Sequence, residues 1–263
     1  MSFRAEFERE VDRGLARAVA PKILTEADIA PLPSALRKYL ILTGAIGQPR
    51  VRNFHATFRG RIRGGPEAPW MEFSGEQYNF YDEPSRLFII DASMRGLPVE
   101  AFHRFRGPSA TMRVKVASLF PMVDAKGPDM NKAETVTLFN DMCVFAPGAL
   151  VDPGIQWREI DPLNVSAAFT NAGITIQAVL TFNAEDELVD FVSDDRLAGS
   201  ADGKSFTPMR WSTPLSGYKA FGPHRVSAYG AGRWHPKGSE PYDYIQLTLT
   251  DIRYNLQAGS PGC

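Results

Sequence analysis

The chain has 263 residues, 44% of them hydrophobic, and carries 29 basic against 30 acidic side chains, for a net charge of -1 at pH 7. This near balance excludes a strong overall attraction to nucleic acid or to an anionic membrane. The length allows a large core without disulfides, and 22 glycines and 20 prolines favour many turns over long helices.

Two short helices are predicted at the start of the chain. The first covers residues 2–20, where apolar residues recur at helical spacing until Pro21 ends the pattern. Its apolar stripe consists of Phe3, Phe7, Val11 and Leu15. The second covers residues 34–43, before the glycines at 44 and 47. We therefore expect residues 1–45 to form a helical segment that packs on a sheet.

From residue 46 onward the apolar period changes from 3.6 to 2, which predicts strands. In residues 50–63, apolar side chains alternate with polar ones, and a solvated sheet face explains the arginines on the polar side better than an anion-binding patch does. Further strands are predicted over 70–80, 87–94, 99–106 and 111–119.

One clear helix is predicted inside this strand-rich region, over residues 132–146. Val136, Phe139 and Cys143 share a face of it, with Asn131 as the expected N-cap. Seven more strands follow, over 155–160, 164–171, 174–182, 187–196, 206–219, 224–235 and 242–254. With so few helices between them, the strands must pair antiparallel. The fold class is thus mainly β, a curved antiparallel sheet of about eleven or twelve strands over 46–257, covered by the central helix.

No targeting segment is predicted. Charges interrupt every apolar stretch of the N-terminal twenty residues, so they do not form a signal peptide. The uncharged stretch 162–184 is long enough to span a bilayer, but its many Asn, Thr, Ser and Gln residues exclude that assignment. Cys143 and Cys263 have no neighbours at disulfide or metal-ligand spacing, and we expect a cytoplasmic protein.

Familiar catalytic and cofactor signatures are missing from the sequence. It contains no His-Glu-x-x-His, Gly-x-Ser-x-Gly, Cys-x-x-Cys or Gly-x-Gly-x-x-Gly pattern. The segment 199–205, Gly-Ser-Ala-Asp-Gly-Lys-Ser, resembles a phosphate-binding loop but is one residue short and is followed by no helix. We therefore expect no metal, no cofactor and no nucleic-acid partner.

One set of titratable residues suggests an enzymatic alternative. Asp91 and His103 alternate with apolar residues of their strands, and Asp141 lies among apolar residues of the helix. Buried together, they would have shifted pKa values and could act as an acid–base group. The structural interpretation is a set of polar groups that satisfy each other inside the sheet. Convergence in one pocket would distinguish the two.

Aromatic and sulfur-containing side chains suggest a binding site for an apolar molecule. Phe139, Met142 and Cys143 lie on the predicted helix, and Trp70 and Trp157 lie in or beside strands. Methionine adapts to variable apolar ligands. A sheet plugged by a helix would need the same residues as core, so both interpretations stay open.

Several segments together resemble an uncharacterised bacterial family of unknown function. The resemblance covers about residues 25–255 and is carried by the segments 32–40, 50–54, 70–77, 124–128, 140–147, 211–214 and 250–254. Examples are Leu-Pro-Ser-Ala-Leu-Arg-Lys-Tyr-Leu in the first and Asn-Asp-Met-Cys-Val-Phe-Ala-Pro in the fifth. The strand-rich layout is similar to that of lipoprotein carriers of the LolA/LolB type, which implies a half-barrel with helices across its open mouth. The resemblance implies no catalytic residue.

Three functional hypotheses follow. The first is binding of a hydrophobic or amphipathic, lipid-like molecule between the concave sheet and helix 132–146, since burial of apolar area favours binding. The second is the acid–base enzyme just described. The third is an interaction module in which the stripe within residues 2–20 docks on a protein partner or on a second copy of the chain.

Overall fold

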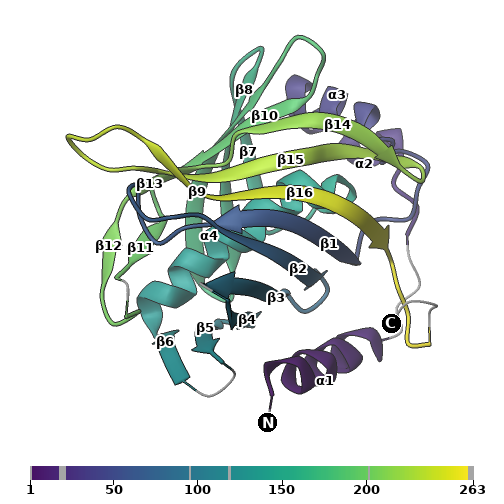
Figure 1. Ribbon diagram of the computed structural model, residues 1–263. Helices are drawn as coiled ribbons and strands as arrows, with labels where there is room; N and C mark the ends of the chain where they lie inside the picture. The colour runs from purple at the N-terminus through teal and green to yellow at the C-terminus, as the bar shows by residue number, and fades with distance from the viewer. Residues whose placement is uncertain (1, 18–21, 95, 118–119, 201, 260–263) are drawn as a thin grey trace.

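The computed structural model describes residues 2–17, 22–94, 96–117, 120–200 and 202–259 (Figure 1). Its helices are α1 (Phe3–Leu15), α2 (Glu26–Ile29), α3 (Ser34–Leu42), α4 (Pro128–Phe145) and the 3-10 turn η1 (Pro147–Ala149). The strands before α4 are β1 (Asn53–Ile62), β2 (Met71–Phe80), β3 (Ser85–Met94), β4 (Leu97–Arg106), β5 (Ser109–Val116) and β6 (Phe120–Lys126). Those after it are β7 (Ile155–Asp161), β8 (Asn164–Asn171), β9 (Ile174–Phe182), β10 (Leu188–Ser193), β11 (Leu197–Gly199), β12 (Phe206–Pro208), β13 (Arg210–Ser212), β14 (Leu215–Phe221), β15 (His224–His235) and β16 (Tyr242–Tyr254).

Fourteen of these strands form a single antiparallel sheet within the described residues. Its order is β6-β5-β4-β3-β2-β1-β16-β15-β13-β10-β9-β8-β7, and β14 also pairs with β15. The sheet is open, because β6 and β7 stand at its two ends. Helix α4 contacts strands near both ends and in the middle, so the sheet curls around it (Figure 1). The predicted fold class, a large curved antiparallel sheet covered by a central helix, is confirmed.

The predicted number of strands was too low. The described residues contain sixteen, because β6 and β11 were not predicted and one predicted strand is divided into three. The predicted strand 187–196 corresponds to β10, and β11 follows it and pairs with β12 in a separate two-stranded sheet. The predicted strand 206–219 splits into β12, β13 and β14 near Pro208 and Pro214. Proline has no N–H to donate to a neighbouring strand, and here it divides runs that alternation alone makes continuous.

Helix α1 covers the convex face of the sheet. Its stripe of Phe3, Phe7, Val11 and Leu15 is buried against β2, β3 and β4. The Phe7 ring lies 6.0 Å from the rings of both Tyr78 and Phe102. This stripe, predicted to dock on a partner, is thus occupied by the chain's own sheet; residues 18–20 of the predicted segment lie outside the described residues. The four consecutive apolar residues Leu87–Ile90 of β3 are buried because helices cover both faces of that strand.

Helix α4 begins four residues earlier than predicted. Gly127 is its N-cap, with a φ of 104° that favours glycine, and Pro128 occupies the first turn, where its missing N–H costs nothing. The helix thus starts at this Gly-Pro sequence, ahead of the predicted range 132–146. Asn131 does not cap; its side-chain oxygen accepts a hydrogen bond from the Ala110 N–H at 2.8 Å.

Two tyrosines fix the C-terminal end of α4. The Tyr39 hydroxyl on α3 donates to the carbonyl of Cys143, and the Tyr254 hydroxyl at the end of β16 donates to that of Phe145, each at 2.8 Å. The last carbonyls of a helix have no partner within it, so these bonds satisfy buried groups. Burial raises the pKa of both hydroxyls well above the usual value, so they remain donors.

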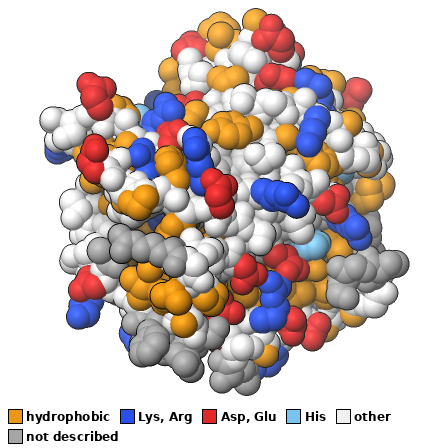
Figure 2. Space-filling model, in the orientation of Figure 1, with side chains coloured by type: hydrophobic (Ala, Val, Ile, Leu, Met, Phe, Trp, Pro, Cys, Tyr) orange, Lys and Arg blue, Asp and Glu red, His pale blue; other side chains and the backbone are white. Residues whose placement is uncertain are grey.

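The outer surface mixes charges of both signs. Figure 2 shows basic and acidic side chains interspersed over one face, as the near-zero net charge predicts. Among the described residues, no helix has the length and apolar composition needed to cross a membrane.

Candidate ligand-binding site

A cavity of about 320 Å³ lies between the N-terminal half of α4 and the concave sheet. Four residues of α4 line it, Met130, Ala133, Glu134 and Thr137, whose spacing places them on one face of the helix. A smaller cavity of about 80 Å³ continues along the same face, lined by Asn140, Asp141, Val144 and Phe145. The two share Arg86, Phe88 and Thr137 as lining residues, so they form one elongated site.

The walls of the larger cavity are mainly apolar. They come from strands at the β6 end and in the middle of the sheet and from the small β11-β12 pair. The apolar lining residues include Phe88, Ile90, Met112, Val123, Ala125, Phe206, Trp234 and Ile245. Inward-facing residues of separate strands meet here because the sheet curls, so the site has no local sequence motif.

A buried ionic network forms the polar side of the site. Arg86 Nε donates to Asp141 Oδ2 at 2.7 Å, and an Arg86 terminal nitrogen lies 3.4 Å from Glu134. Gln77 and Asn79 donate to the same Asp141 oxygen at 2.6 and 3.2 Å. Buried charges are tolerated when they are paired and hydrogen-bonded. Asp141 is thus held by three side chains that donate to one of its oxygens.

Glu134 lies between two arginines. Arg86 approaches it from β3, and Arg196 Nη2 lies 3.5 Å from its Oε1. Burial alone would raise the pKa of Glu134, but the two guanidinium groups outweigh it, and the pKa is lowered. Glu134 is therefore ionised at neutral pH, and it fixes both cations beside the cavity.

Two residues that line the larger cavity each have a buried nitrogen without a hydrogen-bond partner among the described residues: Arg196 at Nε and His103 at Nδ1. Burial lowers the pKa of His103 to about 4, and Arg86 and Arg196 oppose its protonation while Glu134 favours it. The imidazole is therefore neutral at physiological pH. Arg196 is only 9% exposed, and its guanidinium lies 5.5 and 5.9 Å from the ring centres of Trp211 and Trp234.

The edge of the cavity carries a further cation, Arg63. Its Nε donates to the carbonyl of Asp243 at 2.7 Å, and its guanidinium lies 4.5 Å from the ring centre of Trp70. Arg63 lines the larger cavity, whereas Trp70 stacks behind it and also contacts Arg61. Trp70, predicted as a wall residue, thus contacts the site through Arg63.

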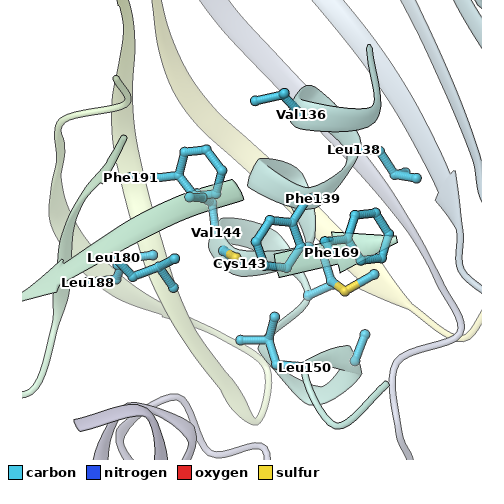
Figure 3. Packing of buried hydrophobic residues seen from close by; sticks show 14 of the residues in the cluster. Val136, Leu138, Phe139, Cys143, Val144, Leu150, Phe169, Leu180, Leu188 and Phe191 are labelled. Atoms are coloured by element: carbon cyan, nitrogen blue, oxygen red, sulfur yellow. The ribbon is translucent and has the colours of Figure 1, made fainter. Parts of the chain in front are cut away.

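The predicted lid residues lie on the opposite face of α4. The Phe139 ring stacks on Phe169 at 4.9 Å and lies 5.8 Å from Phe191 and 5.9 Å from Trp157. Figure 3 shows Phe139 and Cys143 among these core side chains. Met142 is 2% exposed, and Phe139 and Cys143 are fully buried. These residues, with Trp157, pack α4 on β7–β10 and line neither cavity.

The acid–base group proposed from the sequence is not assembled. In the antiparallel register Asp91 lies opposite Glu100 and His103 lies opposite Phe88, which places the two on different faces of the sheet. Asp91 is exposed on the convex face, 3.4 Å from Arg4 of α1. Asp91 does share a face of β3 with Leu87 and Ile89, as its alternation with them indicates. That face of the sheet is covered by α1 rather than by α4.

Three residues central to the site were not proposed from the sequence: Arg86, Glu134 and Arg196. The available signal was the spacing of Glu134, Thr137 and Asp141, which places these three polar side chains on one face of α4. Among the described residues, no cluster of three or more His, Cys, Asp or Glu side chains could hold a metal ion.

Comparison with known proteins identifies a family. The family of unknown function DUF6544 matches residues 22–246, whereas no curated protein gives a match. A DUF1329 protein from Desulfovibrio piger is 10% identical with a TM-score of 0.45, covering 89% of this chain and 94% of its own. A LolA superfamily protein from Nitrosomonas europaea is 12% identical with a TM-score of 0.42, over 84% and 92% of the two chains. Similarities of this size do not transfer a ligand.

Proposed function

The chain belongs to DUF6544, a family of unknown function, and we propose from its cavity that it binds a small amphipathic molecule with an apolar body. The observation that carries this proposal is the 320 Å³ space between α4 and the sheet. Ligand pockets typically enclose about 300 to 1,000 Å³, have mostly apolar walls and present a few polar groups. This cavity has each of these properties.

The apolar walls would supply most of the affinity. Each methylene group removed from water contributes about 0.8 kcal/mol, so a chain of about eight methylenes would gain about 6 kcal/mol before the cost of immobilising it. Protein interiors are normally close-packed, so an open space of this size beside a well-packed core is unusual. The same walls include the flexible side chains of Met112 and Met130, which adapt to ligand shape.

Tryptophan fluorescence offers a direct test, because Trp234 lines the larger cavity and Trp157 lies across α4 from it. We would prepare two variants that each keep only one of these tryptophans, the others being replaced by phenylalanine. Titration with a bromine-labelled decanoic acid should quench Trp234 saturably and leave Trp157 nearly unchanged. Equal quenching of both, or none, would contradict binding at this site.

A cavity-filling variant provides the second arm of the test. Ala133→Leu places a larger side chain into the space, and we expect it to weaken binding by at least about tenfold through the loss of ligand volume. Ala178→Leu, on the packed side of α4, is the matched control, since Ala178 lines neither cavity. Unchanged binding by Ala133→Leu would place the ligand elsewhere.

A further inference from the structure

The charged groups that line the larger cavity are mostly cations. Among the described residues, Arg63, Arg86 and Arg196 line it together with one carboxylate, that of Glu134. Arg86 is already paired by Asp141 at 2.7 Å, whereas the ion-pair contacts of Arg196 are limited to Glu134 at 3.5 Å. A group entering this cavity therefore meets a surplus of positive charge beside mainly apolar walls, where electrostatic interactions are stronger than in bulk water.

Arg196 is held in position while one of its donors remains unused. The two tryptophan rings and Glu134 fix the guanidinium, yet its Nε has no acceptor in the part of the chain that the structure describes. A buried donor without a partner costs about 1 to 3 kcal/mol, which an incoming acceptor would recover. His103, whose Nδ1 has no hydrogen-bond partner among the described residues, lines the same cavity.

Resting on the function proposed above, we propose that the ligand is an amphipathic monocarboxylate whose head group pairs with the guanidinium of Arg196 in the part of the cavity that His103 also lines. Its apolar chain would lie along Phe88 and Ile90, and its far end would reach the smaller cavity beyond Thr137. A hydrogen bond from a guanidinium N–H to a carboxylate oxygen is charge-assisted and about twice as strong as one between neutral groups.

The neighbourhood of Glu134 argues for a single negative charge on the ligand. Its carboxylate contacts Arg196 at 3.5 Å and would repel a second charge on the head group. The neutral imidazole of His103 adds a hydrogen-bonding group without adding charge. A dianionic phosphate would therefore be bound less well than a carboxylate of the same chain length.

The test compares ligands that differ only in the head group. The affinities of decanoate, methyl decanoate, decanol and decyl phosphate would be measured by calorimetric titration at pH 7.5. We expect wild-type protein to bind decanoate at least about tenfold more tightly than each of the other three compounds. Equal binding of decanoate and methyl decanoate would overturn this inference alone, and tighter binding of decyl phosphate would overturn the carboxylate assignment. Binding of none of the four would overturn the proposed function as well.

Two variants test which residues cause the preference for decanoate over methyl decanoate. Arg196→Gln should reduce the preference for decanoate over methyl decanoate to less than about threefold while leaving the affinity for the ester unchanged. His103→Phe keeps the ring volume and should reduce the preference by a smaller factor, so a folding defect in the first variant does not end the test. Arg158→Gln, on the exposed surface of β7, is the control with the same change of charge. An undiminished preference in Arg196→Gln and His103→Phe would overturn the assignment.

Discussion

The two sides of helix α4 differ in how they meet the sheet. On the side of β7–β10, Phe139 and Cys143 pack against aromatic and aliphatic side chains without an intervening cavity. On the side of β1–β5 and β16, Glu134, Thr137 and Asp141 face an ionic network and an open space. The first side holds the helix in place, and this allows the second side to keep a cavity. The comparison teaches that stability and binding are divided between two faces of one element.

Truncation of a large side chain on each face tests this division most severely. Phe139→Ala removes a ring from a close-packed cluster, and we expect a loss of about 4 kcal/mol in the free energy of unfolding. Met130→Ala removes a side chain that already borders open space, and we expect about 2 kcal/mol, at the low end for such a change. Urea denaturation of both variants gives the two values. Equal losses would show that the cavity side is as tightly packed as the other.

One pH-dependent contribution to stability should come from His103 on the cavity side. The folded pKa of His103 is about 4 against an ordinary value of 6.5, so the unfolded state binds the proton more readily. This contribution to stability is complete above pH 6.5 and is lost as the pH falls toward 4. At pH 5 the loss is about 2 kcal/mol relative to pH 7. On the packed side, burial raises the pKa of the Cys143 thiol, so it does not titrate in this range.

Comparison with His103→Phe isolates that contribution. Urea denaturation at pH 7 and pH 5 gives the free energy of unfolding of wild type and variant. From pH 7 to pH 5 this free energy should fall by about 2 kcal/mol more in the wild type than in the variant. The lowered pKa of Glu134 acts with the same sign but below its ordinary value of 4.5, outside this window. Equal drops in wild type and variant would mean that the imidazole is not shielded from water.

Insertion of a larger side chain should give the smallest difference in the free energy of unfolding between the two faces of α4. Ala178→Leu inserts a side chain into close-packed core and should cost about 1 to 3 kcal/mol, whereas Ala133→Leu extends into the cavity and should cost less than about 1 kcal/mol. Thermal unfolding followed by circular dichroism resolves a difference of this size, since 1 kcal/mol shifts the midpoint of a chain this long by about 2 °C. A larger loss for Ala133→Leu would show that the space cannot accept a side chain.

The fold class could be predicted from the sequence because its signals are local. Alternation of apolar residues, interrupted by Gly and Pro, predicts strands, and one run with helical spacing predicts the helix across them. The start of α4 was missed because the proline at its first turn, Pro128, was interpreted as a terminator rather than an N-terminal signal.

The candidate site was only partly predictable, for two physical reasons. Helix α4 is buried on nearly all sides, so apolar residues surround it and periodicity does not distinguish the packed face of Phe139 from the cavity face of Thr137. Strand β3 is covered by helices on both faces, so apolar alternation does not tell which of its residues face α4. That Asp91 and His103 lie on opposite faces of the sheet follows only from the pairing register of β3 with β4. Arg196 follows β10 and reaches the cavity only through the curvature of the sheet.

The two tyrosine bonds at the end of α4 also bear on how the chain folds. Tyr39 and Tyr254 reach the helix across 104 and 109 residues, from opposite directions along the sequence. The C-terminal end of α4 therefore has both of these hydrogen bonds only when segments from the early and the late parts of the chain have packed against it. Contacts of such long range slow folding, because the entropy of closing each loop is lost before the contact forms. We therefore expect the sheet to close around α4 late in folding, after the hairpins that precede and follow this helix in the sequence have formed.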